Sequence, residues 1–364
     1  MNSVIIIPTL KPDDKIIRLV KDLKKEEFDK IVVVDDGSGK DYSSIFESLE
    51  KLGCKVTHHE VNKGKGEGIK TGIKFANKEF KDFVGYITVD GDYQHLPCDV
   101  KKVALKMEED DTKIVLGERN FKEKNVPPKS KIGNGFSTLF FRLQTGVYVE
   151  DTQTGLRGIP FRYRKFALGI EGSRYEYEMN FLREAAEGGI KFEMVRIETV
   201  YEDNNKGSHF RPLRDAALIY KELIRFSIIS ILSAIIDVAL FAVLIKIFTK
   251  FDIDVFDALV TSFALSKTTV ITATSNIAAR IVSGVFNFSM NRKVAFKSTG
   301  NSSKQALKYI ILFLIQMGVS TLLVSLCSHL PVNLTAMKIV IDVIIFFVNY
   351  FIEKRFIFKK KVIE

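Results

Sequence analysis

Four long apolar segments follow one another toward the C-terminus, and they constrain the fold more than any other feature. They cover about residues 226–248, 268–290, 306–330 and 334–352. Each is close to the length at which a helix rising 1.5 Å per residue crosses a hydrocarbon core of roughly 30 Å. Buried helices of a soluble domain are the alternative, but four such runs in succession favour membrane spans. We therefore predict an all-α transmembrane domain of four helices within residues 226–358.

The charge of the chain is divided in the same way. The 364 residues carry a formal net charge of +10. Up to Glu222 there are 38 Lys and Arg against 37 Asp and Glu, whereas the rest of the chain has 16 against 7. The excess positive charge flanks apolar segments and forms no soluble basic face, so it indicates a membrane and argues against a nucleic-acid partner.

The flanking charges also predict a topology. Residues 250–267 contain three aspartates, whereas residues 292–308 and the basic tail 359–364 are rich in Lys and Arg. By the positive-inside rule, the N-terminal part and both termini lie in the cytoplasm, and the protein is a multi-pass protein of the cell membrane. Three cysteines without C-x-x-C spacing argue against disulfides or a zinc site. Residues 213–225 have the spacing of an amphipathic juxtamembrane helix.

Three charged residues, Asp237, Arg280 and Asp342, lie inside the predicted spans. An ionised group is costly there unless it is paired, so we expect them to face the interior of the bundle, with Arg280 close to at least one aspartate. Structural pairing and a role toward a lipid headgroup or in transport both stay open. Small residues such as Ser283 and Gly284 support helix packing within or between chains, which leaves a homo-oligomer open.

The first 212 residues have a different pattern, in which short β-branched runs alternate with helical spacing. Strands are predicted over 4–8, 31–35, 55–58, 84–89 and 113–116, and helices over 13–24, 42–52, 68–77 and 99–109. This alternation predicts an α/β, Rossmann-like domain with a mostly parallel sheet. Ligands of such sheets bind at the carboxyl ends of the strands.

Polar residues gather at those strand ends. Asp36 and Gly37 follow the second strand, a glycine-rich run with Lys65 follows the third, and Asp90-Gly91-Asp92 follows the fourth. Asp90, Asp92 and Gln94 offer the oxygen ligands that Mg²⁺ or Mn²⁺ prefers, although a solvated turn explains a lone D-x-D equally well. Together the clusters indicate a nucleotide diphosphate. There is no Walker A loop, and no G-x-G-x-x-G follows the first strand.

These stretches, in this order, resemble glycosyltransferase family 2 enzymes with a GT-A fold, of the polyprenol-phosphate type related to dolichol-phosphate mannose synthase. The matching residues are Ile7 to Leu10, Val34 to Ser38, Asn62 to Gly66, Asp90 to His95, Gly117 to Arg119 and Asp151 to Arg157. The tail is similar to the four-span GtrA-like family, through Ser283 to Phe288 and Asn349 to Phe351. The resemblance implies a GT-A domain over 1–212 joined to a GtrA-like domain over 226–358.

The resemblance also implies roles for single residues. The donor nucleotide would meet Pro8, Asp36, Gly37, Lys65, Asp90 and Gly91, and the metal would be held by Asp90, Asp92 and Gln94. The acceptor phosphate would meet Arg119, Lys131 and Arg211. Asp92, Asp151 and Arg119 would be catalytic. Asp151 is a candidate base or positioning group, with a turn cap as the plain alternative. Lys11-Pro12 departs from the family pattern.

The implied reaction is the inverting transfer of one sugar from a nucleotide-diphosphate sugar to an undecaprenyl or dolichyl phosphate, for cell-surface glycosylation. The donor would belong to the UDP-glucose, UDP-GlcNAc or GDP-mannose class. A different reading is a translocator or binding module for lipid-linked sugars, with a regulatory or inactive glycosyltransferase domain. A processive polysaccharide synthase is disfavoured, because its Q-x-x-R-W motif needs a tryptophan and the chain has none.

Overall fold

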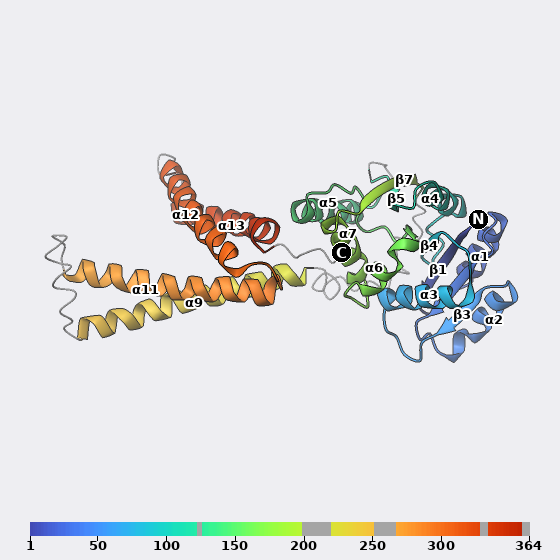
Figure 1. The fold of residues 1–364 in the computed structure, drawn as a ribbon, viewed down its shortest axis with the longest axis horizontal. Helices are drawn as coiled ribbons and strands as arrows, with labels where there is room; N and C mark the ends of the chain where they lie inside the picture. The colour runs from blue at the N-terminus through green and yellow to red at the C-terminus, as the bar shows by residue number, and fades with distance from the viewer. Residues whose placement is uncertain (122–125, 199–219, 251–266, 328–333, 359–364) are drawn as a thin grey trace. The chain divides into compact units, whose positions relative to one another are not determined.

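The computed structural model describes residues 1–121, 126–198, 220–250, 267–327 and 334–358. The chain divides into two compact units, Met1–Ile219 and Tyr220–Glu364 (Figure 1). The predicted contact residue Arg211, the stretch 213–219 of the predicted juxtamembrane helix and the tail 359–364 lie outside the described residues.

The first unit is built on one mixed sheet of seven strands in the order β3-β2-β1-β4-β6-β5-β7. The strands are β1 (Ser3–Thr9), β2 (Ile31–Asp35), β3 (Lys55–His58), β4 (Gly85–Thr88), β5 (Lys113–Arg119), β6 (Arg157–Pro160) and β7 (Lys191–Ile197). Four of the six strand pairs are parallel, and only β6 runs against its neighbours β4 and β5. The expectation of a mostly parallel sheet is confirmed.

Helices cover both faces of this sheet, as the strand–helix alternation predicts. They are α1 (Lys15–Lys25), α2 (Ser43–Lys51), α3 (Lys65–Glu79), α4 (Pro97–Glu109), α5 (Pro128–Thr145), α6 (Arg164–Gly169) and α7 (Glu176–Glu187). One apolar core joins α1, α2 and α4 to the sheet, and a second joins α3, α5, α6 and α7 to it. Successive residues of β1, such as Ile5 and Ile6, pack into opposite cores, so this strand is buried on both faces.

Two elements have bounds that differ from the prediction. Helix α3 starts at Lys65, three residues before the expected helix, because Gly64 before it has φ +102° and ends the preceding loop. Strand β5 continues through Arg119, beyond the expected Leu116, because its last residues pair with β7. Both extensions bring charged side chains from loops onto regular elements.

The second unit is helical. Its helices are α9 (Lys221–Lys250), α11 (Lys267–Met290), α12 (Ser302–Cys327) and α13 (Leu334–Ile352). Within the described part of the chain, α9 is the one helix that is long and apolar enough to cross a membrane. The prediction of four spans therefore stays a prediction. Aromatic rings of Phe226, Phe296 and Tyr350 pack together where α9 begins and α13 ends, with centroids 5.3–5.9 Å apart.

Candidate active site

The D-x-D residues lie on the loop after β4, and two other elements contact them. The Lys65 Nζ atom, at the start of α3, lies 2.7 Å from Asp90 Oδ1 and 3.0 Å from Glu178 Oε1 of α7. All three side chains are at least partly buried. Lys65 therefore joins the D-x-D loop to α7. The pairing of Glu178 with Lys65 was not predicted from the sequence.

The two aspartates of the D-x-D loop have opposite electrostatic surroundings. Burial alone would raise the pKa of Asp90, yet the charges of Lys65 and His95 lower it to about 2. Burial and the charge of Asp90 raise the pKa of Asp92 to about 6. Asp92 also keeps solvent-exposed surface, which screens part of this effect. An added cation would therefore relieve the repulsion at Asp92 first.

The carboxylates of the D-x-D loop suit a divalent cation that is also coordinated by phosphates of a bound substrate. Asp90 and Asp92 supply carboxylates, and the Gln94 backbone N–H donates to Asp92 Oδ1 at 3.1 Å, which holds the loop in a turn. Among the residues that the structure describes, no group of three or more His, Cys, Asp or Glu forms a complete metal cage. Mg²⁺ is commonly held by one or two carboxylates together with substrate phosphates, and this loop fits that mode.

Asp36 is buried after β2, and its carboxylate holds the loop that leads into α3. It accepts hydrogen bonds from the backbone N–H groups of Lys63 at 2.8 Å and Gly64 at 2.7 Å, and from the Asn62 amide at 3.0 Å. Gly37, with φ +79°, lies so close that an added Cβ would be 2.7 Å from the Asn62 nitrogen. Asp36 and Gly37 thus set the position of Lys65. The role of Asp36 toward a nucleoside stays a prediction.

Pro8 and Gly91 lie close to the same strand ends. Pro8 is buried in β1, and a Cβ added to Gly68 of α3 would be 3.0 Å from the Pro8 Cβ. A Cβ added to Gly91 would lie 3.4 Å from Thr9 Oγ1. Both residues therefore allow close packing around the end of β1, and no polar side chain of theirs is available for a ligand.

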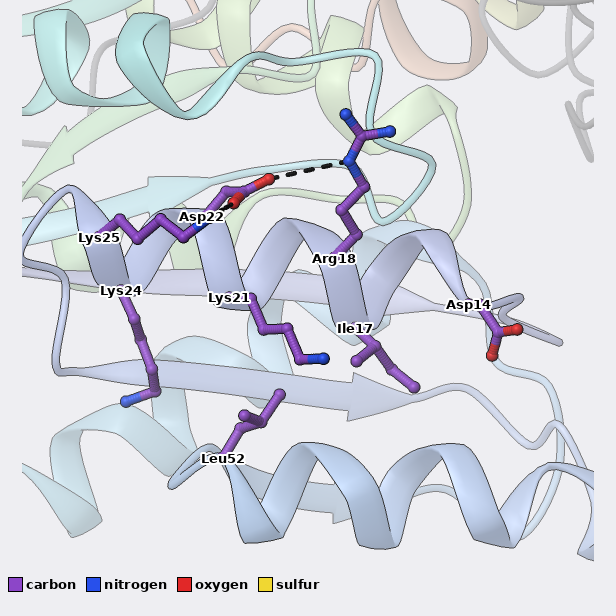
Figure 2. Close-up of a pocket in the computed structure, with 8 residues that line it drawn as sticks. All are labelled: Asp14, Ile17, Arg18, Lys21, Asp22, Lys24, Lys25 and Leu52. Atoms are coloured by element: carbon purple, nitrogen blue, oxygen red, sulfur yellow. Dashed lines mark hydrogen bonds and ion pairs between the residues drawn. The ribbon is translucent and has the colours of Figure 1, made fainter.

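Tyr93 fixes the D-x-D loop to α1. Its hydroxyl donates to Asp22 Oδ2 at 2.7 Å, and the Arg18 guanidinium lies 4.5 Å from its ring centroid. Figure 2 shows Arg18 and Asp22 on the side of α1 that points away from α2. Arg18 and Asp22 also line a groove of about 850 Å³, together with other residues of α1 and with Leu52, which follows α2. None of the predicted site residues lines this groove.

Asp151 and Arg119 form a two-pronged ion pair beside the D-x-D loop. The Arg119 Nε donates to Asp151 Oδ2 at 2.6 Å, and Nη2 donates to Oδ1 at 2.9 Å. The Gln153 backbone N–H donates to Oδ1 as well, at 3.1 Å. Asp151 is fully buried, whereas Arg119 is partly exposed. Because both carboxylate oxygens are engaged, this arrangement suits positioning of Arg119 better than proton abstraction.

The loop that carries Asp151 also contacts Asp90. A Cβ added to Gly155 would be 2.4 Å from Asp90 Oδ2, so only glycine fits there without a shift. Buried Arg157 holds the loop from behind, because its Nε donates to the Thr154 carbonyl at 3.0 Å and its Nη1 donates to the Glu178 carbonyl at 2.7 Å. The structure therefore brings the D-x-D residues, Lys65 and the Asp151–Arg119 pair into one contiguous site.

Other predicted residues lie elsewhere. Lys131 is exposed on α5. In the helical unit, Arg280 Nε lies 3.5 Å from Asp237 Oδ2, and Ser283 Oγ donates to Asp237 Oδ1 at 3.0 Å. Both charged residues and Asp342 line a cavity of about 260 Å³.

Two family descriptions match this chain. Residues 4–174 match Glycosyl transferase family 2, and residues 253–358 match the GtrA/DPMS transmembrane domain.

Among curated relatives, "Uncharacterized protein MJ1222" of Methanocaldococcus jannaschii is 34% identical over 203 residues, which cover 55% of this chain and 82% of the relative. A UDP-N-acetylglucosamine–dolichyl-phosphate N-acetylglucosaminyltransferase of Methanococcus voltae is 33% identical over 222 residues, covering 55% and 86%. Among solved structures, mannosyl-3-phosphoglycerate synthase of Rubrobacter xylanophilus has a TM-score of 0.46 at 15% identity, covering 62% of this chain and 72% of that one. From the extent of the sequence matches, the chain belongs to glycosyl transferase family 2 and is a glycosyltransferase that carries a GtrA/DPMS transmembrane domain.

Proposed function

We propose that this protein transfers one sugar from a nucleotide-diphosphate sugar to a polyprenyl phosphate, with inversion, at the cytoplasmic face of a membrane. The observation that carries the proposal is the contact of the D-x-D loop with the loop of the Asp151–Arg119 pair. Asp90 and Asp92, which would bind the metal and the donor diphosphate, thus lie in the same site as Arg119, which would bind the acceptor phosphate. The Methanococcus voltae relative makes UDP-GlcNAc and a dolichyl phosphate the first candidates, ahead of UDP-glucose and GDP-mannose.

On the donor side, Asp90, Asp92 and Gln94 would hold Mg²⁺ or Mn²⁺. When bound, the cation would offset the negative charge that develops on the diphosphate leaving group. Lys65 holds Asp90 ionised and in place. Asp36 and Gly37 shape the loop that positions Lys65, and Pro8 and Gly91 let the strand ends approach the nucleotide closely.

On the acceptor side, an oxygen of the lipid phosphate attacks the anomeric carbon. The bond between that carbon and the diphosphate breaks, and its electron pair leaves with the nucleotide. A monophosphate carries nearly two negative charges at neutral pH, so the attacking oxygen needs no general base. Arg119 can grip phosphate in two-pronged fashion once Asp151 has set its orientation, and Lys131 and Arg211 would add charge. In this scheme Asp151 is a positioning residue.

The second unit would keep the enzyme at its lipid substrate. We place four spans in residues 226–352, with the catalytic unit and both termini in the cytoplasm. A polyprenyl chain leaves the bilayer only at a cost of about 0.8 kcal/mol per CH₂, so its phosphate has to be met at the interface. The Arg280–Asp237 pair is consistent with charges that face other helices.

The direct test is product analysis with the full chain in lipid nanodiscs. Purified protein is supplied with each NDP-sugar, a polyprenyl phosphate and Mg²⁺ or Mn²⁺, and the lipid product is identified by mass spectrometry. We expect a polyprenyl-phosphate monosaccharide whose formation stops on chelation. Asp92→Asn is expected to lower kcat by about 10²–10³-fold. Asp41→Asn, at an exposed aspartate near the start of α2, is the matched control and should have no effect.

The opposite result would favour the second reading of the sequence. If no donor releases nucleotide and Asp92→Asn cells behave like wild type, the chain acts as a translocator or binding module for lipid-linked sugars.

A further inference from the structure

Tyr93 has a backbone conformation that bulky residues rarely adopt. Its φ is +64°, in the left-handed region, where a side chain crowds the backbone and only glycine is free of strain. Tyr93 stands between Asp92 and Gln94, the two predicted metal ligands at the end of the D-x-D loop. Strained backbone persists only where surrounding contacts enforce it, and it gathers at functional sites. The contacts of Tyr93 therefore indicate what the strain serves.

The side chain of Tyr93 is anchored on α1. Its ring packs against the apolar core that α1, α2 and α4 share, and the Arg18 guanidinium lies 4.5 Å from the ring centroid. Its hydroxyl donates to Asp22 Oδ2 at 2.7 Å. Asp22 is held in turn, because Lys25 Nζ and Arg18 Nε lie 2.7 Å and 3.8 Å from its carboxylate (Figure 2). These contacts offset the strain and keep residue 93 in one conformation.

The conformation of residue 93 determines the shape of the D-x-D loop. The loop turns at Tyr93, and in this turn the Gln94 backbone N–H reaches Asp92 Oδ1 at 3.1 Å. At the other end of the loop, the Asp90 backbone N–H donates to buried His95 Nδ1 at 3.4 Å. A metal site binds more tightly when partners outside the coordination sphere hold its ligands in place beforehand. Tyr93 lies where it can do this for Asp92 and Gln94.

We propose that Tyr93 is a positioning residue for the metal, and that its anchor on α1 holds the left-handed turn in which Asp92 and Gln94 meet the cation. The phenol acts through the backbone and through Asp22. Helix α1 thereby becomes part of the support of the metal site, although none of its residues was predicted to belong to the site. The inference rests on the proposed function, which gives Asp90 and Asp92 their metal role.

Binding of Mn²⁺ tests the anchor without turnover. The full-length protein in nanodiscs is titrated with Mn²⁺ in the presence of UDP, and free Mn²⁺ is measured by electron paramagnetic resonance. Tyr93→Phe removes only the hydroxyl and is expected to weaken Mn²⁺ binding by about tenfold. Asp22→Ala should weaken it at least as much, and the double variant should bind like Asp22→Ala, because both changes break the same hydrogen bond. Tyr42→Phe, at a tyrosine beside the same core, is the matched control and should bind normally.

Glycine and alanine at position 93 separate backbone positioning from packing. Both remove the phenol, but glycine adopts the left-handed conformation without strain and alanine does not. We expect Tyr93→Ala to bind Mn²⁺ about tenfold more weakly than Tyr93→Gly. Equal binding, or tighter binding by the alanine variant, would overturn the proposal, since a packing role favours the larger side chain. Glu27, an exposed residue with φ +68°, is the backbone control, and its glycine and alanine variants should both bind like wild type.

Steady-state kinetics give a second measure of positioning. The Mn²⁺ concentration for half-maximal rate should rise about tenfold in Tyr93→Phe, whereas kcat at saturating Mn²⁺ should stay within about twofold of wild type. A fall in kcat that excess Mn²⁺ does not restore would contradict a role in positioning the metal.

The same binding assay with Asp92→Asn distinguishes failure of this inference from failure of the proposed function. If Asp92→Asn binds Mn²⁺ normally, the D-x-D loop does not hold the metal and both are rejected. If Asp92→Asn loses Mn²⁺ while the Tyr93 variants bind normally, only the role of Tyr93 is rejected. If both positions matter for Mn²⁺ but no polyprenyl product forms with any donor, the proposed reaction is rejected and the role of Tyr93 is retained.

Discussion

Replacement of Lys65 by methionine removes one charge from the centre of the candidate site and keeps the length of the side chain. Lys65 Nζ lies 2.7 Å from Asp90 Oδ1 and 3.0 Å from Glu178 Oε1. Burial would lower the pKa of Lys65, but the charges of Asp90 and Glu178 raise it well above its usual value. The lysine is therefore a permanent cation, and its loss leaves two acids without their partner.

The expected cost follows from distance and burial. At 3 Å and an effective dielectric constant of 20, each ion pair is worth about 5 kcal/mol before the cost of desolvation. Lys65 and Glu178 are only 17% and 12% exposed, so solvent screens them weakly. Breaking a buried pair by removing one partner costs about 3–5 kcal/mol, and we expect Lys65→Met to destabilise the first unit by that amount. Glu178→Gln, which leaves the Asp90 contact intact, should cost about 1–2 kcal/mol.

Hydrogen exchange of β4 peptides in the full-length protein measures this effect, since exchange there reports the opening of the unit. A loss of 3–5 kcal/mol corresponds to exchange about 10²–10⁴-fold faster. Lys70→Met is the matched control on the same helix, because the Lys70 Nζ lies 4.0 Å from its nearest carboxylate partner, Glu67. We expect it to cost about 1 kcal/mol.

The double variant decides the argument. In Lys65→Met/Glu178→Gln, we expect a coupling free energy of about 1–3 kcal/mol, because the second change removes an acid that the first has left unpaired. The deficit of Lys65→Met should also shrink as pH falls from about 4 toward 2, because folded wild-type Asp90, whose pKa is lowered to about 2, then gains a proton and loses its attraction to Lys65. If the two single costs add within about 0.5 kcal/mol, the three groups do not act as one cluster and the reasoning is refuted.

Three further changes probe the same unit. Gly155→Ala puts a methyl group 2.4 Å from Asp90 Oδ2, so turnover should fall about 10²-fold. The control Gly169→Ala adds a methyl group in open space and should stay active. Equal activity of the two variants would contradict the close approach of Gly155 to Asp90. Asp151→Asn removes the charge partner of Arg119 and should speed exchange of peptides over 151–160 by about 10²-fold, and unchanged exchange would exclude a structural ion pair. Burial raises the pKa of Cys54 from 9.0 to about 11, so ionisation of the thiol favours the unfolded chain between these pH values. The free energy of unfolding should be unchanged below pH 9 and fall by about 2 kcal/mol up to pH 11. This decline should be absent in Cys54→Ala.

Local patterns predict the first half of the sheet well. The strand Ile31–Asp35 has the predicted bounds, because four consecutive β-branched residues suit a strand that is buried on both faces. By contrast, β6 (Arg157–Pro160) contains a glycine and a proline in four residues, which locally favours a turn. It is a strand because it fits between β4 and β5, a pairing that joins Thr88 to Arg157 and that no local window contains.

The sequence indicates which residues belong to the candidate site, but it does not indicate which of them contact one another. The D-x-D residues stand out by their place after a predicted strand, and the family resemblance adds Arg119 and Asp151; their roles stay predictions. Lys65 pairs with Glu178, and the Asp36 carboxylate accepts hydrogen bonds from the loop before α3. Both contacts join residues far apart in the chain, so no local pattern predicts them. Helix α5 is not among the predicted helices, because its buried side mixes the polar residues Asn134, Ser137 and Thr138 with Phe140 and Phe141, while Ile132, Phe136 and Leu139 are exposed, so no single apolar stripe marks it.

The reversed strand β6 has a consequence for the order in which the chain is made. It is synthesised after β4 and β5 but lies between them, so the nascent β4 exposes an open hydrogen-bonding edge until β6 arrives. At about 5–20 residues per second, the roughly 60 residues from Arg157 to Lys221 take about 3–13 s to synthesise. The chain thus has seconds to pair β6 with β4 and β5 before the apolar helix α9 appears. Changes that slow the insertion of β6 should therefore reduce the yield of membrane-inserted protein more than its stability once folded.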